Sequence, residues 1–225
     1  MRRKRAAQRA LETPRAAGLA GVVFALLLAA AIVLIRLGMP QGAGAVTAQA
    51  FTNSERRDSL QSALALVPFA GIFFLWFMAT IRAHVGAAED RFLATVFLGS
   101  GLVFTATLFG AAAAAGAVLS VPHPAGTAPA PAYWDFGRHF AYTMMVGYGM
   151  RMAAVFVSVV SAIGHRLGVL PRFLTALGLL TALTLLFAAS NVPWSELVFP
   201  GWSLVLSLYI LVASGRPRSR PAPRA

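Results

Sequence analysis

Six long apolar stretches, almost free of charge, divide this chain of 225 residues. Five of them contain no Asp, Glu, Lys or Arg, and cover residues 16–35, 59–81, 92–121, 173–195 and 197–215. The remaining stretch, 139–165, is interrupted only by Arg151. A bilayer's hydrocarbon core is roughly 30 Å thick and a helix rises about 1.5 Å per residue, so about 20 apolar residues suffice to cross it. Each stretch is therefore long enough to span a membrane as a helix.

The composition excludes several other classes of protein. Only 12% of the residues are charged, against about 25% in an ordinary soluble domain. No stretch alternates with a period of two residues, as a transmembrane β-strand would. The chain has no Cys, which excludes disulfides, iron–sulfur clusters and thiol nucleophiles. The sequence therefore predicts an all-α polytopic transmembrane bundle.

The predicted organisation has three parts: a basic arm over 1–15, a transmembrane domain over 16–215 and a basic tail over 216–225. Six spanning helices are expected at about 16–36, 59–81, 92–118, 139–164, 172–190 and 196–214. Asp58 or Ser59 is expected to cap the second helix, and Pro171 fits the first turn of the fifth. Short connections predict that helices two and three, and helices four and five, are antiparallel neighbours.

Basic residues are unequally divided between the two sides that these spans define. One side receives both chain ends and the even-numbered connections, with 14 basic and 3 acidic residues; the other receives 4 of each. Positively charged loops stay in the cytoplasm. Both termini are therefore expected to be cytoplasmic, in a cell (inner) membrane protein.

The net charge of +12 is better explained by contact with lipid than by binding of nucleic acid. A nucleic-acid-binding protein gathers its cations on one folded face, whereas here they are spread over short loops and tails, so no nucleic-acid partner is expected. The expected partners are the bilayer and, at the basic termini, anionic lipid head groups. A protein partner or a homo-oligomer remains open.

The first stretch also has a rival interpretation as a cleaved signal peptide, but its apolar run exceeds the usual 7–15 residues.

Arg151 is the one charge inside a predicted span, with 12 residues of its window before it and 14 after. Helical spacing places it on one face with Met144, Gly147, Tyr148, Ala154, Val155, Ser158, Ala162 and His165. The opposite face carries Val146, Ala153, Phe156, Val157 and Val160. Because small residues let membrane helices approach closely, the face of Arg151 is expected to point into the bundle.

Two interpretations of Arg151 remain open. In the first it ties helices together by donating to backbone carbonyls or to hydroxyls such as those of Ser100, Thr105 and Thr107. In the second it binds an anionic or polar ligand, with Tyr148 and Ser158 as the other candidate ligand-binding residues. Charges inside a membrane are functional candidates by default.

No motif points to catalysis, a metal or a cofactor. None of His84, His123, His139 and His165 has a histidine at the i, i+3 or i+4 spacing of metal-binding pairs. The chain contains no phosphate-binding loop, no H-E-x-x-H and no nucleophile elbow. We therefore predict no catalytic residue, no metal and no cofactor.

Four segments carry a resemblance to a known group of proteins. They are Pro68–Phe77 (PFAGIFFLWF), Glu89–Leu102 (EDRFLATVFLGSGL), Tyr148–Phe156 (YGMRMAAVF) and Val169–Gly178 (VLPRFLTALG). From about Ser59 to Leu211 the chain resembles uncharacterised six-span integral membrane proteins of high-GC bacteria. The resemblance implies the six-span fold, and it brings no assigned activity and no catalytic residues.

Three classes of function follow. The composition best fits a non-catalytic membrane scaffold or subunit, or a lipid-interacting protein. The alternative is a small-molecule or ion transporter or channel in which Arg151 lines a polar cavity. A membrane enzyme that acts on lipid is the third, and the lack of an acid–base cluster counts against it.

Overall fold

The computed structural model describes residues 14–39, 53–85, 91–120, 130–189 and 191–215. Most of these residues are helical, and no strand occurs among them, as predicted. Seven α-helices, two π-helical segments and one 3₁₀ turn follow in the order α2 (Pro14–Gly38), α4 (Ser54–Val85), α5 (Arg91–Ser120), α6 (Pro131–Tyr142), η2 (Thr143–Gly149, π), α7 (Met150–Arg166), α8 (Arg172–Leu183), η3 (Thr184–Ala188, π), η4 (Ser195–Leu197, 3₁₀) and α9 (Val198–Gly215).

Five helices of the described chain are long and apolar enough to cross a membrane, which indicates a membrane-embedded protein. They are Gly18–Gly38, Ser54–Arg82, Arg91–Ser120, Pro131–Arg166 and Ser195–Ser214. The fourth is continuous through α6, η2 and α7. The fifth predicted span, over 172–190, forms a shorter apolar helix at Arg172–Ala188. Five of the six expected spans thus correspond to helices of spanning length.

Two helices begin earlier than the charge pattern predicts. Asn53 rather than Asp58 or Ser59 caps α4: its Oδ1 accepts the Glu55 backbone N–H at 2.8 Å, and the Ser59 hydroxyl instead donates to the Glu55 carbonyl. The fourth span begins at Pro131, eight residues before the expected His139. Pro131 fits this first turn because its missing N–H would have no helical partner there.

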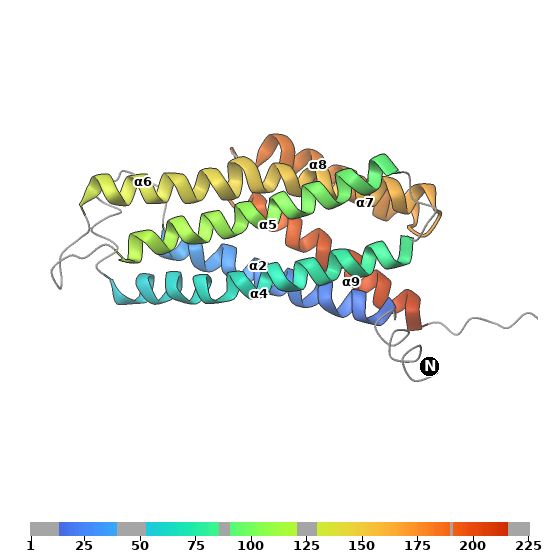
Figure 1. Ribbon diagram of the computed structural model, residues 1–225, viewed down its shortest axis with the longest axis horizontal. Helices are drawn as coiled ribbons and strands as arrows, with labels where there is room; N and C mark the ends of the chain where they lie inside the picture. The colour runs from blue at the N-terminus through green and yellow to red at the C-terminus, as the bar shows by residue number, and fades with distance from the viewer. Residues whose placement is uncertain (1–13, 40–52, 86–90, 121–129, 190, 216–225) are drawn as a thin grey trace, which may run out of the picture.

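The helices form a closed ring in which each contacts the next: α2 contacts α4, α4 contacts α5, α5 contacts α6 and α7, α7 contacts α8, and α9 contacts both α8 and α2. Figure 1 shows their long axes running roughly alongside one another. The predicted neighbours are antiparallel. In α4 and α5, Gly71 lies against Phe109 and Gly101 against Met78; in α7 and α8, Gly178 lies against Ser161, close to the turn in which Leu170 lies against Gly164.

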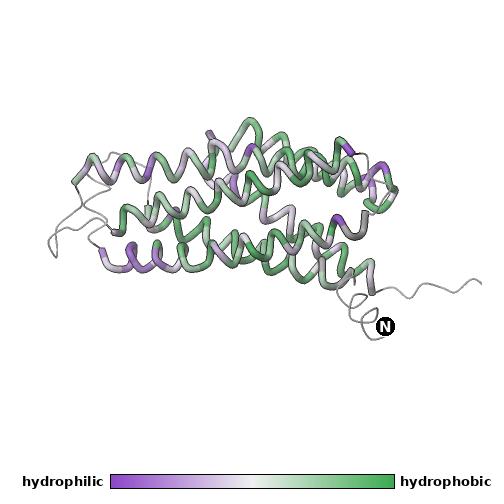
Figure 2. The backbone as a smooth tube through the Cα atoms, viewed as in Figure 1, coloured by the Kyte–Doolittle hydropathy of each residue, from purple (hydrophilic) through white to green (hydrophobic). Residues whose placement is uncertain are grey.

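The two ends of the bundle differ in the elements they carry. One end, which we call the terminal end, holds the start of α2, the end of α9 and the turn between α7 and α8 (Figure 1). Gly18 of α2 packs there against Leu211 of α9. The opposite, distal end holds Gly38, Ser54 and Pro131. In Figure 2 the most hydrophilic stretches lie toward these ends, at the start of α4 and at the α7–α8 turn.

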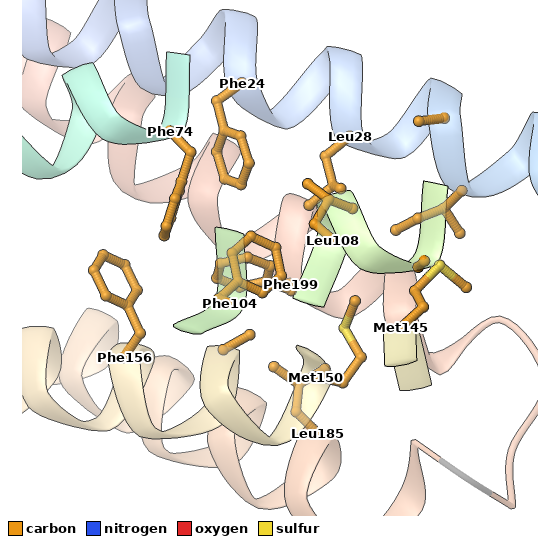
Figure 3. Packing of buried hydrophobic residues seen from close by; sticks show 14 of the residues in the cluster. Phe24, Leu28, Phe74, Phe104, Leu108, Met145, Met150, Phe156, Leu185 and Phe199 are labelled. Atoms are coloured by element: carbon orange, nitrogen blue, oxygen red, sulfur yellow. The ribbon is translucent and has the colours of Figure 1, made fainter. Parts of the chain in front are cut away.

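Phenylalanine side chains from five helices fill the centre of the bundle. Phe24, Phe74, Phe104, Phe156 and Phe199 come from α2, α4, α5, α7 and α9, and each is at most 1% exposed. Their side chains converge in Figure 3. The ring centroids of Phe24 and Phe74 lie 4.7 Å apart, and those of Phe104 and Phe199 lie 5.0 Å apart. These spacings are those of packed aromatic pairs, so the middle of the bundle is a solid core.

Candidate functional site

Arg151 lies on the outer surface of α7, and the prediction that it points into the bundle is wrong. Its side chain is exposed. The bulky face predicted to point outward is the buried one: Val146, Ala153, Phe156, Val157 and Val160 all lie inside. Phe156 decides this orientation, since its ring packs 5.1 Å from the rings of both Phe74 and Phe97. Of the small residues predicted on the face of Arg151, Ala154 is buried, whereas Gly147, Ser158 and Ala162 are half-buried.

Within the described chain, the Arg151 guanidinium has one hydrogen-bond partner, the carbonyl of Gly147 on its own helix. Helical side chains lean toward the N-terminus of their helix, so the guanidinium is directed toward the distal end. The hydroxyls of Ser100, Thr105 and Thr107, expected as acceptors, instead donate to carbonyls of α5 at 2.8–3.2 Å. Arg151 therefore does not tie α7 to another helix.

The other two predicted ligand-binding residues share the surface of Arg151 without bonding to it. Tyr148 is 57% exposed. Ser158 is half-buried, and its hydroxyl donates to the Ala154 carbonyl at 2.9 Å. Gly147, Val155 and Ala162 are half-buried on the same side of the helix. We call Gly147, Arg151, Val155, Ser158 and Ala162 the Arg151 face.

A π-helical segment, η2, ends two residues before Arg151. Its wider turn changes the rotation of the helix, so the residues of α6 do not continue in α-helical register into α7. Gly149 of η2 sits close to α5, where a Cβ would lie 3.1 Å from the Thr107 hydroxyl oxygen. Short π-helical turns occur frequently at functional sites. The Arg151 face thus begins at an irregularity in the longest helix of the bundle.

A second polar site, at the distal end, has no counterpart in the sequence predictions. Arg36 of α2 and Glu196 of η4 form an ion pair with an N–O distance of 2.5 Å, and their side chains are 10% and 0% exposed. The sequence placed both residues at span edges on the same membrane side, but 160 residues apart. The sequence did carry a signal for the pair, because the two residues have opposite charges and lie at the same edge of the predicted spans.

Aromatic side chains enclose this ion pair. The Arg36 guanidinium lies 5.3 Å from the Trp194 ring centroid and 5.8 Å from that of Tyr142. The Tyr142 hydroxyl donates to the Met39 carbonyl at 2.9 Å, which ties α6 to the end of α2. Trp194 has φ of 68°, an uncommon conformation for a side chain of this size. The cluster fastens α2, α6 and the start of α9 together at the distal end.

The Arg36–Glu196 pair leaves one atom on each partner without a hydrogen bond in the described chain, Arg36 Nε and Glu196 Oε2. A buried pair is stable only when both charges stay matched. This arrangement neutralises charge and fixes helices. No group of three His, Cys, Asp or Glu residues that could hold a metal occurs in the described chain.

Two of the four histidines have described side chains, and both are exposed. His165 lies at the terminal end, and His139 lies at the distal end, where its Nε2 is 3.4 Å from a guanidinium nitrogen of Arg138. His123 and the side chain of His84 lie outside the described residues, as do the basic arm over 1–13 and the tail.

Comparison with known proteins identifies no relative: no protein-family model, curated protein or solved structure matches this chain.

Proposed function

We propose that this chain is a non-catalytic subunit or scaffold of a membrane assembly. The observation that carries the proposal is the solid aromatic core. Phe24, Phe74, Phe104, Phe156 and Phe199 fill the middle of the bundle, where a transporter would need a route for its substrate. A bundle closed in this way presents its chemistry on its outer surface.

The buried hydroxyls also favour a packing role over a pathway. Ser161 lies against Gly178, with its oxygen 2.0 Å from the position of a Cβ there. Ser207 lies equally close to Gly21. Small residues at such contacts let membrane helices approach closely. The transporter alternative also required Arg151 to line a cavity inside the chain, and Arg151 lies outside.

We further propose six crossings, with the terminal end in the cytoplasm of a cell-membrane protein. Four exposed arginines, Arg82, Arg91, Arg166 and Arg172, lie at the terminal end. This distribution fits the positive-inside rule and supports contact with anionic lipid head groups there. Arg172–Ala188 has 17 residues, about 25 Å of helix, which is at the lower end of the spanning range. The antiparallel packing of α2 and α9 supports an even number of crossings.

Single cysteines test the closed core directly, because the chain has no native Cys. Ser161 and Ser203 are both 0% exposed. We expect Ser161→Cys and Ser203→Cys to stay unreactive toward a charged methanethiosulfonate in membrane vesicles, since no water reaches them. Ala130→Cys, exposed at the distal end, is the positive control. Fast labelling at either buried site would reveal a water-filled route and favour the transporter.

The same approach tests the topology. Leu167 lies in the α7–α8 turn, and Val192 lies between α8 and α9; both are exposed. In intact cells we expect an impermeant thiol reagent to label Ala130→Cys and Val192→Cys, and to label Leu167→Cys only after permeabilisation. Labelling of Val192→Cys together with Leu167→Cys would show that α8 does not cross. The reverse pattern for all three would invert the orientation.

A further inference from the structure

The Arg151 face combines a charge with small residues on a surface otherwise dominated by apolar side chains. Gly147 and Val155 flank Arg151 by one turn on either side, and Ser158 and Ala162 continue the face toward the terminal end. Four of the five residues are small or β-branched, and the guanidinium uses a single protein acceptor within the described chain. A guanidinium has five N–H donors, so most of them are left for a group outside this chain.

The depth of Arg151 separates it from lipid phosphates. Arg138 at the distal end and Arg166 at the terminal end lie 13 and 15 residues away along the continuous helix, which is about 20 Å and 22 Å of helix. A bilayer with its head groups is about 40–45 Å thick. Arg151 therefore sits near the midplane, and both phosphate layers lie beyond the reach of one side chain.

The part of a second copy that the structure describes offers no carboxylate at the depth of Arg151. Among the described residues, Glu55, Asp58 and Asp135 lie at the distal end, and Glu196 is buried against Arg36. Two copies joined through the same face would bring their Arg151 side chains together. This distribution favours a complementary group that comes from a different protein.

Resting on the proposed role as a subunit, we infer that the Arg151 face binds a transmembrane helix of another protein that carries an Asp or Glu near its middle. The small side chains allow the partner helix to come close. The guanidinium then donates to the partner's carboxylate inside the bilayer, where the pair is shielded from water. The π-helical η2 segment positions Gly147 and Arg151 for this contact.

A designed helix tests the inference directly, because it supplies the carboxylate on a transmembrane segment of defined sequence. The probes are two synthetic transmembrane peptides of Leu and Ala that differ at the central residue, Asp in one and Leu in the other. The full chain is reconstituted in phosphatidylcholine vesicles at pH 7.5 and labelled through Leu167→Cys, and energy transfer reports association. We expect the Asp peptide to bind at least tenfold more tightly than the Leu peptide. Equal binding of the two peptides would overturn the inference.

Variants of the face separate charge from shape. Arg151→Leu should remove the preference for the Asp peptide, and Arg151→Lys should keep part of it. Ala162→Phe should weaken binding of the Asp peptide about tenfold by blocking the approach of the helix, whereas Leu180→Phe, on the exposed surface of α8, should not. Because Arg151 is exposed, Arg151→Leu leaves no buried group unpaired, and its melting temperature should match the parent chain.

Two outcomes assign failure to different causes. In the first, the parent chain shows no preference between the peptides and the Arg151→Leu variant loses co-purified phospholipid. This result would identify a lipid as the occupant of the face and overturn the inference, while leaving the subunit role intact. In the second, water reaches the thiol of Ser161→Cys or Ser203→Cys, which would overturn the proposed function whatever the peptides do.

Discussion

Replacing Glu196 with Leu should lower the free energy of unfolding by about 3–5 kcal/mol. The substitution removes the partner of Arg36, whose side chain is only 10% exposed, and leaves a charge between the Trp194 and Tyr142 rings. Unfolding measured by steric trapping in lipid nanodiscs gives this quantity in a bilayer. Asp58→Asn, an exposed carboxylate at the same end, is the matched control and should change stability by less than about 0.5 kcal/mol.

The double variant Arg36→Met with Glu196→Leu distinguishes an unpaired charge from lost packing. Buried ion pairs replaced by apolar residues of similar volume are often neutral or more stable by about 1–4 kcal/mol. The double variant should therefore recover most of the loss. A cost below about 1 kcal/mol for Glu196→Leu alone would show that the unpaired Arg36 reaches water at the distal end, and that the pair contributes little to holding α2 against η4.

Helix number and neighbours were largely predictable because the bilayer imposes a length on every crossing. Arg36, Asp58 and Arg82 end or begin apolar stretches, and helices of spanning length occur at those positions. Helix ends were less predictable. Charge marks where the membrane ends, but α4 and α6 continue past that level: Asn53 caps α4, and Pro131 opens α6. Backbone hydrogen bonding decides those boundaries.

The orientation of α7 was not predictable from the small-residue rule. The rule finds surfaces where helices approach closely, but it does not say whether the neighbouring helix belongs to the same chain. Phe156 settles the question only through contacts with Phe74, Phe97 and Phe199, which lie 43–82 residues away in sequence. The Arg36–Glu196 pair escaped prediction for the same reason, since its two halves lie on opposite ends of the chain.

The close contact between α2 and α9 leads to the second large effect. A Cβ at Gly21 would lie 2.0 Å from the Ser207 hydroxyl oxygen and 2.7 Å from the Phe77 ring. Gly21→Ala should therefore force the helices apart and cost about 1–3 kcal/mol, the usual range for overpacking. Steric trapping in nanodiscs again measures it. Gly21→Ile should cost more, because a branched side chain extends the clash into the aromatic core.

Gly99→Ala is the matched control for this packing, because a Cβ there meets nothing within 4 Å. It should leave stability unchanged or raise it by up to about 1 kcal/mol, since Ala favours the helix over Gly. Ser207→Gly combined with Gly21→Ala removes the hydroxyl from the clash and should recover part of the loss, but not the part due to Phe77. If Gly21→Ala and Gly99→Ala had equal effects, helix propensity rather than the fit between α2 and α9 would determine the role of Gly21. A larger loss of stability for Gly21→Ala than for Gly99→Ala would show that the fit between α2 and α9 requires glycine at position 21. The same interface packs the two helices antiparallel.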